Sequence, residues 1–288
     1  MNQVKLFIDL TRLKKPIGYM LLFWPCAWGL TLAYDFSLSL NNYFFYLILF
    51  FLGSVLMRSA GCIVNDIFDR KYDAKVFRTK NRPIASGKVS VNLAIFYSLT
   101  LCFLALTVLI NFNFFTITLA LISMPLAFTY PLMKRFTYWP QLFLGVTFNY
   151  GLILGWTAIT GELDIIPIIF YFGAIFWTLG YDTIYGYQDI KDDEIIGLKS
   201  TSIKFKSNPK KFLLISYSFF FILFLIGGIF MKFSFYYYLL SLVPLLHLFF
   251  FQMRVFNINN PSSCLKAFKS NNMFGLIILL NILIVKNL

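Results

Sequence analysis

The sequence predicts an all-α protein that crosses a membrane as a bundle of nine helices, and three observations support this fold class. Of its 288 residues, 59% are hydrophobic and only 13% are charged, which leaves too little polar surface to cover a soluble globule. The charged residues also bound apolar intervals of about 20 residues, the length that a membrane helix needs. Finally, no stretch is long enough to form a second soluble domain, so we expect one domain over 1–288.

The segment 1–15 is amphipathic and predicts a helix that lies at the lipid headgroups. It differs from a signal peptide because Asp9 interrupts it and no small-residue cleavage site follows. Its apolar residues at helical spacing are Leu6, Phe7, Leu10 and Leu13, and the basic residues beside them are Lys5, Arg12, Lys14 and Lys15.

Nine predicted spans follow in order, each enclosed by charged residues. The interval from Lys88 to Lys134 holds two of them, because the polar residues 111–113 divide it. The last span is somewhat short. The other intervals are Lys15–Asp35, Asp35–Arg58, Arg135–Glu162, Asp164–Asp182, Lys211–Lys232, Lys232–Arg254 and Lys269–Lys286.

Basic residues concentrate in alternate connections, which predicts the orientation. The amino-terminal segment and the even-numbered connections are rich in Lys and Arg, whereas the other connections hold only Lys232 and the tail only Lys286. We therefore expect the amino terminus to be cytoplasmic. The net charge is +13, but the basic residues lie between hydrophobic runs and do not form a soluble basic face interleaved with aromatic residues. We therefore expect no nucleic-acid partner.

Cysteine and histidine give no sign of a metal or redox centre. The single histidine, His247, lies in an apolar run without a second ligand nearby, and we expect it to pack between helices. The cysteines lack the spacing of a zinc site or a disulfide framework and are expected to be small core residues: Cys26, Cys62, Cys102 and Cys264.

Eight of the 12 acidic residues lie in two short windows with matching geometry. In a helix, side chains four residues apart share one face. The first window is NDIFDRKYD, which holds Asn65, Asp66, Asp69 and Asp73. The second is YDTIYGYQDIKDDE, in which Tyr181, Tyr185, Asp189 and Asp193 follow one another at intervals of four.

The two acidic windows are expected to meet in one cavity on the cytoplasmic side. Four predicted crossings separate them, and an even number returns the chain to the same face. Closely spaced carboxylates repel one another unless a cation binds, and oxygen ligands with room for phosphate oxygens favour Mg²⁺. A single acidic run would more often be a solvated loop, but two matched copies on one side favour a metal site.

Basic residues near these windows complete a predicted diphosphate site. Because the site would open into an apolar bundle, it suits a lipid-like allylic diphosphate whose ionisation Mg²⁺ and cationic side chains assist. Aromatic faces would stabilise the resulting carbocation, and the pattern leaves its carbon acceptor open. The candidate diphosphate-binding residues are Arg78, Lys80, Arg82, Lys134, Arg135 and Lys199.

The windows resemble the two motifs of the UbiA superfamily of intramembrane prenyltransferases, NDxxDxxxD and YxxxYxxxDxxxD, and both motifs are complete. Longer segments are similar to the 4-hydroxybenzoate branch of that superfamily. The resemblance runs from about Arg12 to Thr201. Lys14 is a departure from it, because the family often has an acidic residue just before KPIG. The segments are KPIGYMLLFWP (15–25), RSAGCIVNDIFDRKYDAKVFRTKNRPIASG (58–87), YPLMKRFTYWPQLFLG (130–145) and GYDTIYGYQDIKDDEIIGLKST (180–201).

The resemblance implies a nine-helix prenyltransferase that uses Mg²⁺ to transfer a polyprenyl group from its diphosphate to position 3 of 4-hydroxybenzoate, in ubiquinone biosynthesis. It implies a bacterial inner membrane location, a cytoplasmic active site and no obligate protein partner. Asp182 and Asp192 are weaker candidate ligands. The implied ligands of Mg²⁺ and diphosphate are Asn65, Asp66, Asp69, Asp73, Asp189 and Asp193, of which Asp69, Asp73, Asp189 and Asp193 are the expected catalytic residues.

Further roles are expected for an arginine and three aromatic side chains. An intramembrane charge needs a functional reason, so Arg58, at the end of the second span, is the candidate ligand for the acceptor carboxylate. Tyr130, Tyr181 and Tyr185 are the candidates that face the carbocation.

Two alternatives differ in function. One is a related enzyme with another acceptor, such as haem, chlorophyllide, homogentisate or dihydroxynaphthoate, which the segments GCIVNDIFDR and YWPQ disfavour. The other is a secondary transporter, whose ion-binding acids lie near the membrane midplane between repeated halves. Here the acids lie at helix ends, and no inverted repeat is visible.

Overall fold

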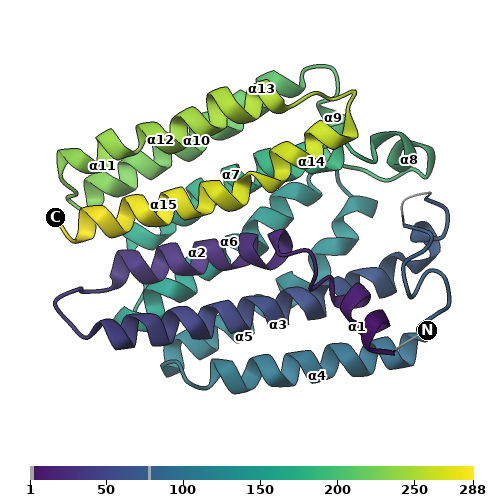
Figure 1. Cartoon of the computed structure of the whole chain (residues 1–288), viewed down its shortest axis with the longest axis horizontal. Coiled ribbons are helices and arrows are strands. Elements are labelled where there is room, and N and C mark those ends of the chain that lie inside the picture. Colours follow the sequence, from purple (N-terminus) through teal and green to yellow (C-terminus); the bar gives the residue numbers. More distant parts are fainter. Residues whose placement is uncertain (1–2, 77–78) are drawn as a thin grey trace.

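The computed structural model describes residues 3–76 and 79–288, and within these ranges it contains helices and no strand. The long helices lie side by side along one common axis (Figure 1). Their bounds are α1 Gln3–Thr11, α2 Ile17–Ala33, α3 Leu40–Asp73, α4 Val91–Leu109, α5 Phe114–Thr129, η1 Tyr130–Arg135, α6 Pro140–Thr160, α7 Ile165–Gly186, α8 Ile190–Ile195, α9 Thr201–Lys204, α10 Pro209–Phe230, α11 Phe235–Leu240, α12 Leu242–Leu246, η2 His247–Gln252, α13 Met253–Val255, α14 Pro261–Lys269 and α15 Asn271–Lys286.

The predicted all-α membrane bundle is confirmed. In the described ranges, eight helical segments are long and apolar enough to cross a membrane. The remaining predicted span is α2, which is equally apolar but has only 17 residues, or about 26 Å at 1.5 Å per residue. The chain is therefore a multi-pass membrane protein, and its described residues hold eight candidate spans of full length and one shorter apolar helix.

Helix α2 lies inside the bundle and packs closely against α6. A Cβ atom at Gly29 would lie 2.0 Å from the Leu152 carbonyl oxygen, and one at Gly155 would lie 2.3 Å from the Cys26 carbonyl oxygen. Only glycine permits this approach of two helix backbones. Almost every residue from Leu21 to Leu32 is buried as a result, which places the KPIG segment beside the core.

Helix α3 is longer than a membrane span, and this length carries the first acidic motif. Its 34 residues extend about 51 Å, whereas the hydrocarbon layer is about 30 Å thick. The helix begins in an apolar stretch after Ser39 and continues without a break through Asp73. The motif therefore has the regular helical geometry that its four-residue spacing predicts.

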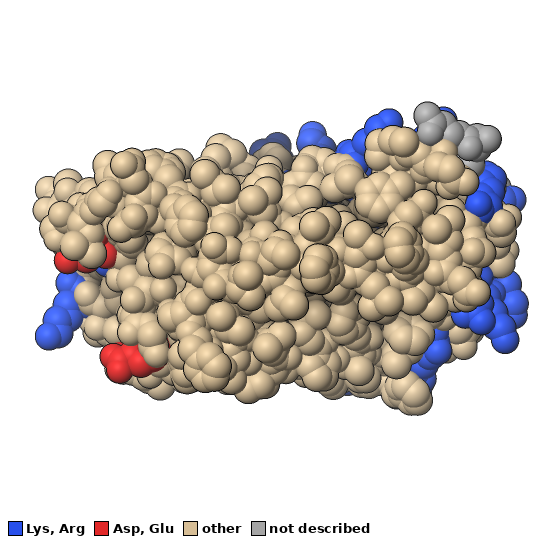
Figure 2. Space-filling model, turned by 90° about the horizontal axis from the view of Figure 1, so that it is seen from below, with Lys and Arg blue, Asp and Glu red and all other residues tan. Residues whose placement is uncertain are grey.

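The two ends of the bundle differ in charge. Figure 2 shows that Lys and Arg gather toward one end of the molecule, while most of the face shown carries no charged residue. The amino terminus lies at this end and the carboxyl terminus at the opposite end (Figure 1). This polarity agrees with an odd number of crossings and with the expected placement of basic connections.

Helix α1 packs on the bundle through its apolar side. Leu6 and Leu10 are buried in a cluster with Ala60 and Ile63 of α3. This contact fixes the amino-terminal segment against the helix that carries the first motif. Its position at the lipid headgroups stays a prediction.

The helical pattern is interrupted at one predicted position and at one that was not predicted. Asn113 caps α5 by accepting a hydrogen bond from the Thr116 amide at 2.9 Å, which separates α4 from α5 as the polar residues 111–113 predict. Helix α7 ends at Gly186. The second motif is consequently divided between α7 and the short helix α8, a feature that its four-residue spacing did not predict.

Candidate active site

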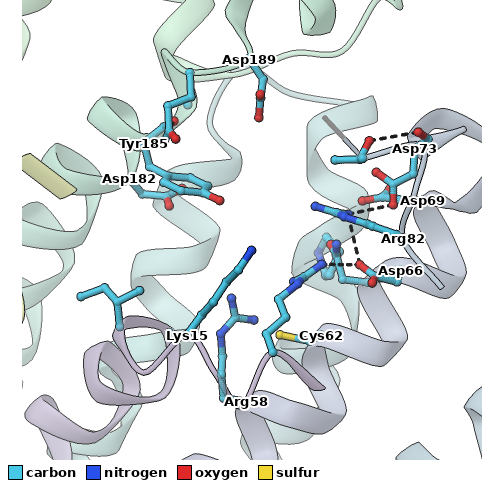
Figure 3. Close-up of a pocket in the computed structure, with 18 of the residues that line it drawn as sticks. Lys15, Arg58, Cys62, Asp66, Asp69, Asp73, Arg82, Asp182, Tyr185 and Asp189 are labelled. Carbon is cyan, nitrogen blue, oxygen red and sulfur yellow. Dashed lines mark hydrogen bonds and ion pairs between the residues drawn. The ribbon is translucent and has the colours of Figure 1, made fainter. Parts of the chain in front are cut away.

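A cavity of about 1270 Å³ opens at the basic end of the bundle. Both acidic windows line it, together with residues of α1, α2, α6 and α14. Figure 3 shows Asp66, Asp69 and Asp73 on one wall and Asp182, Tyr185 and Asp189 on the other. The two acidic windows therefore meet in one cavity, as the sequence predicts.

The first wall is a row of three buried aspartates on α3. Asp66, Asp69 and Asp73 are 2%, 1% and 7% exposed, which is rare for carboxylates without paired charges. Asn65 also lines the cavity. The regular spacing along α3 explains why all of these side chains reach the same space.

Basic side chains balance the charge of this row. Arg82 donates hydrogen bonds to Asp66 at 3.1 Å and to Asp73 at 2.8 Å, and so bridges two turns of the helix. Lys134 donates to Asp69, and the Arg135 guanidinium lies 3.5 Å from the other oxygen of that carboxylate. These pairs keep a buried anionic row stable and place cations where a bound anion would also meet them.

The second wall departs from the predicted stripe. Tyr181 and Tyr185 lie on α7, but the helix ends at Gly186, so Asp189 and Asp193 do not continue its face. Gly186 packs against α9, where a Cβ atom would lie 2.3 Å from the Ser202 hydroxyl. Asp189 precedes α8, and both aspartates still line the cavity. The turn replaces helical continuity in bringing them to the site.

The carboxylates fit a magnesium–diphosphate site in which the substrate supplies part of the coordination. In the described ranges, no group of three or more acidic, histidine or cysteine side chains surrounds a common point. Mg²⁺ commonly binds one or two carboxylates together with phosphate oxygens and water, so such a cage is not required. One buried oxygen of Asp69 has no hydrogen-bond partner in the described structure, which suits a metal ligand.

Arg58 lies deeper in the cavity, on the same helix as the first motif. It is two turns before Asp66, or about 12 Å along α3. Its guanidinium lies over the Phe148 ring at 5.5 Å, and its buried Nε has no hydrogen-bond partner within the described residues. A Cβ atom at Gly18 would lie 3.0 Å from this nitrogen, so the glycine of KPIG leaves the space that Arg58 needs.

The three predicted tyrosines also contribute to the cavity wall. Tyr130, Tyr181 and Tyr185 are all lining residues. The Tyr185 ring lies 4.5 Å from the Phe268 ring of α14, and the Tyr181 ring lies 5.8 Å from the same ring. The aromatic wall is thus built from the second motif and the carboxyl-terminal helices.

The predicted basic residues have different positions. Arg82, Lys134 and Lys199 line the cavity, whereas Lys80 and Arg135 do not. The weaker candidate ligand Asp192 is not a lining residue either. Arg135 nevertheless lies 3.5 Å from an Asp69 carboxylate oxygen and donates a hydrogen bond of 2.8 Å to the Phe68 carbonyl. Arg78 lies outside the described residues.

Several cavity residues could not be found from motif spacing. Arg12 of the amino-terminal segment donates a hydrogen bond to Asp66, and Lys15 reaches into the centre of the cavity (Figure 3). Asn272 and Phe268 reach the cavity from the carboxyl-terminal helices, for which no motif was recognised. Basic residues next to KPIG were visible in the sequence, but their pairing with α3 was not.

Comparisons with known proteins agree with this architecture. The UbiA prenyltransferase family profile matches residues 22–278. The 4-hydroxybenzoate polyprenyltransferase of mitochondria from Bos taurus is 46% identical over 282 residues, which cover 96% of this chain and 74% of that protein. Its Homo sapiens counterpart is 44% identical with the same coverage of each chain.

Solved structures show the same fold. A UbiA homologue from Aeropyrum pernix K1 has a TM-score of 0.76 at 22% identity, covering 93% of this chain and 98% of that one. A UbiA homologue from Archaeoglobus fulgidus bound to GPP and Mg²⁺ has a TM-score of 0.69 at 18% identity, covering 98% and 100%.

The bundle and its cavity define a membrane-embedded enzyme with a divalent-metal site. The chain belongs to the UbiA prenyltransferase family.

Proposed function

We propose that this chain transfers a polyprenyl group from polyprenyl diphosphate to position 3 of 4-hydroxybenzoate, ortho to the hydroxyl, as a step of ubiquinone biosynthesis. The observation that carries the proposal is the layered cavity: acidic residues and their cations lie at its mouth, and Arg58 lies deeper among aromatic side chains. The relatives from Bos taurus and Homo sapiens, 46% and 44% identical, support the same acceptor.

The mouth of the cavity is the proposed diphosphate site. Mg²⁺ bound there neutralises the diphosphate and stabilises it as a leaving group. Arg82 and Lys134 already lie beside the aspartates and can shift their hydrogen bonds to phosphate oxygens when the carboxylates take up metal. The proposed metal ligands are Asn65, Asp66, Asp69, Asp73, Asp189 and Asp193, and the proposed anion-binding residues are Arg78, Lys80, Arg82, Lys134, Arg135 and Lys199.

The deeper part of the cavity is the proposed acceptor site. Arg58 can hold the benzoate carboxylate through two parallel hydrogen bonds, and its lack of a partner for Nε in the described structure suits this role. Tyr130, Tyr181 and Tyr185 present aromatic surface to the allylic cation without attacking it. We also propose that residues 1–288 form one prenyltransferase domain.

An acceptor panel tests this assignment. Membranes that contain the chain are incubated with Mg²⁺, one polyprenyl diphosphate and, in turn, 4-hydroxybenzoate, homogentisate, dihydroxynaphthoate, haem or chlorophyllide. We expect prenylated product from 4-hydroxybenzoate alone. Product from another acceptor and none from 4-hydroxybenzoate would make this chain a prenyltransferase of different specificity.

Replacing Arg58 by lysine is expected to raise the KM for 4-hydroxybenzoate much more than the KM for the diphosphate. A lysine keeps the charge but cannot reproduce the bidentate contact, and a hydrogen bond to a charged group contributes about 1.5–3 kcal/mol, or about 10- to 150-fold. Steady-state kinetics in which each substrate is varied separately measure both constants. Equal changes in the two constants, or no change, would remove Arg58 from the acceptor site.

Location and orientation are separate proposals. We propose that the chain lies in a bacterial cytoplasmic membrane with its amino terminus and its active site on the cytoplasmic side. Reporter fusions within 196–208 and after Leu288 are then expected to report opposite sides, because these positions lie at opposite ends of the bundle (Figure 1). Matching reports would contradict the proposed number of crossings.

A further inference from the structure

One cavity-lining carboxylate, the weaker candidate ligand Asp182, is not among the proposed metal ligands. Asp182 lies on α7, four residues or about one turn before the helix ends at Gly186, and it lines the cavity together with Asp189. Figure 3 shows it across the cavity from Arg58 and close to Tyr185. The two motif helices thus place opposite charges on the two sides of the cavity: a guanidinium from α3 and a carboxylate from α7.

These opposite charges face one another without forming an ion pair in the described structure. Both side chains line the cavity, but no contact of salt-bridge length joins them in the described residues. Lys15 reaches toward the same space from the amino-terminal segment (Figure 3). A charged pair that stays apart inside an apolar bundle leaves room for a ligand with complementary ends.

A para-hydroxy acid has these ends. Its carboxylate matches Arg58, and its phenolic hydroxyl, at the opposite end of the ring, can donate a hydrogen bond to Asp182. A ring held in this way spans the cavity between α3 and α7, the two helices that carry the acidic motifs. This inference rests on the proposed function, because it concerns the acceptor of the same reaction.

We propose that Asp182 is the general base that accepts the phenolic proton of the acceptor. Loss of this proton lets the oxygen donate its electron pair into the ring, which makes the ortho carbon a stronger nucleophile. The ortho carbon forms a bond to C1 of the allylic group, while the bond from C1 to the diphosphate oxygen breaks and its electron pair leaves with the diphosphate.

The proton balance then closes without an additional reagent. The product of carbon–carbon bond formation is a dienone that still carries hydrogen at the substituted carbon. That proton passes to the departing diphosphate, which restores the aromatic ring, and Asp182 returns its proton to the phenolate oxygen. One proton leaves with diphosphate in each turnover, and Asp182 ends in its starting state.

The test combines an isosteric variant with an acceptor that ionises more easily. Asp182→Asn keeps the shape and a hydrogen-bond acceptor but removes the base. With 4-hydroxybenzoate and saturating diphosphate we expect kcat to fall about 10²- to 10⁴-fold, the usual contribution of general acid–base catalysis, with only a small change in KM. Fluorine beside the hydroxyl, in 3-fluoro-4-hydroxybenzoate, lowers the phenol pKa and leaves the other ortho carbon free. With this acceptor, we expect the ratio of the wild-type kcat to the Asp182→Asn kcat to be at least about tenfold smaller than with 4-hydroxybenzoate.

Three controls give each outcome a meaning. Arg58→Lys is expected to show no fluorine-dependent recovery, because its defect lies in binding. Asp182→Glu retains a carboxylate and is expected to keep the wild-type preference between the two acceptors. If the asparagine variant does not insert, the kcat values of the glutamate variant with the two acceptors are compared instead. Binding of radiolabelled 4-hydroxybenzoate to the purified Asp182→Asn variant is expected to stay near the wild-type value.

The outcomes separate this inference from the proposed function. If the wild-type chain forms no product from 4-hydroxybenzoate, the proposed function fails. If the wild type is active and Asp182→Asn retains its kcat, loses activity only through KM, or shows the same deficit with both acceptors, Asp182 is not the base. If Asp182 only balanced the charge of Arg58, the Asp182→Asn variant would lose activity only through KM.

Discussion

Replacing Asp69 by asparagine is expected to reduce prenyl transfer by on the order of 10³-fold or more, because electrostatic stabilisation of a leaving group contributes strongly to catalysis. Asp69 is 1% exposed, contacts both Lys134 and Arg135, and keeps one oxygen without a hydrogen-bond partner in the described structure. Asparagine has the same shape but lacks the negative charge that binds a divalent cation. Initial rates with saturating Mg²⁺ and both substrates measure the loss.

A matched control lies at the opposite end of the bundle. Asp35 is exposed and accepts a hydrogen bond from the Ser37 amide at 2.9 Å, which an asparagine oxygen can also accept. Asp35→Asn is therefore expected to leave transfer near the wild-type rate. Monodisperse elution of both purified variants would show that each is folded. An Asp69→Asn variant that is folded and retains more than about a tenth of wild-type activity would contradict the role of Asp69 as metal ligand.

Replacing Asp189 by asparagine is expected to cause a loss of similar size, although this residue comes from the other wall of the cavity. The acids of α3 and those around α8 belong to segments that are far apart in sequence, and the cavity unites them (Figure 3). If they hold one metal–diphosphate complex, the loss of either wall removes the same function. If the variant keeps residual activity, this activity is expected to need a higher Mg²⁺ concentration than that of the wild type.

The double variant Asp69→Asn, Asp189→Asn provides the sharper comparison. Residues that act as one unit have strongly non-additive effects, so the double variant is expected to be little worse than either single variant. Initial rates of the four proteins form a double-mutant cycle. Single losses that multiply in the double variant would show that the two walls act independently.

The sequence predicted the first wall of the site well because its geometry is local. Asn65, Asp69 and Asp73 repeat at intervals of four, and α3 continues as a regular helix through all of them. Helical periodicity then fixes a shared face without knowledge of the rest of the fold. The membrane spans were predictable for the same reason, since length and apolarity are properties of each segment.

The second wall shows where a repeating interval misleads. Tyr181, Tyr185, Asp189 and Asp193 also repeat at intervals of four, but the helix ends at Gly186. The end is set by packing against α9, where Ser202 donates a hydrogen bond of 2.8 Å to the Thr183 carbonyl. The partner lies 19 residues further along the chain, so spacing within the motif holds no information about it.

The remaining cavity residues depend on tertiary contacts. Arg12 pairs with Asp66 across 54 residues, and Phe268 packs on Tyr185 from helices without a recognised motif. Asp182 was predicted only as a weaker candidate ligand, and its position across the cavity from Arg58 required the relative placement of α3 and α7 (Figure 3). Charge and burial identify such residues only once the helices are packed together.

The most direct test of the account uses the purified chain alone in lipid nanodiscs with 4-hydroxybenzoate, a polyprenyl diphosphate and Mg²⁺. Mass spectrometry is expected to detect a product with one added polyprenyl group, and NMR is expected to place the new carbon–carbon bond ortho to the hydroxyl. Chelation of Mg²⁺ should abolish this product, and restored Mg²⁺ should recover it. Free polyprenyl alcohol without prenylated acceptor, or a product that forms equally well in the presence of chelator, would contradict the account.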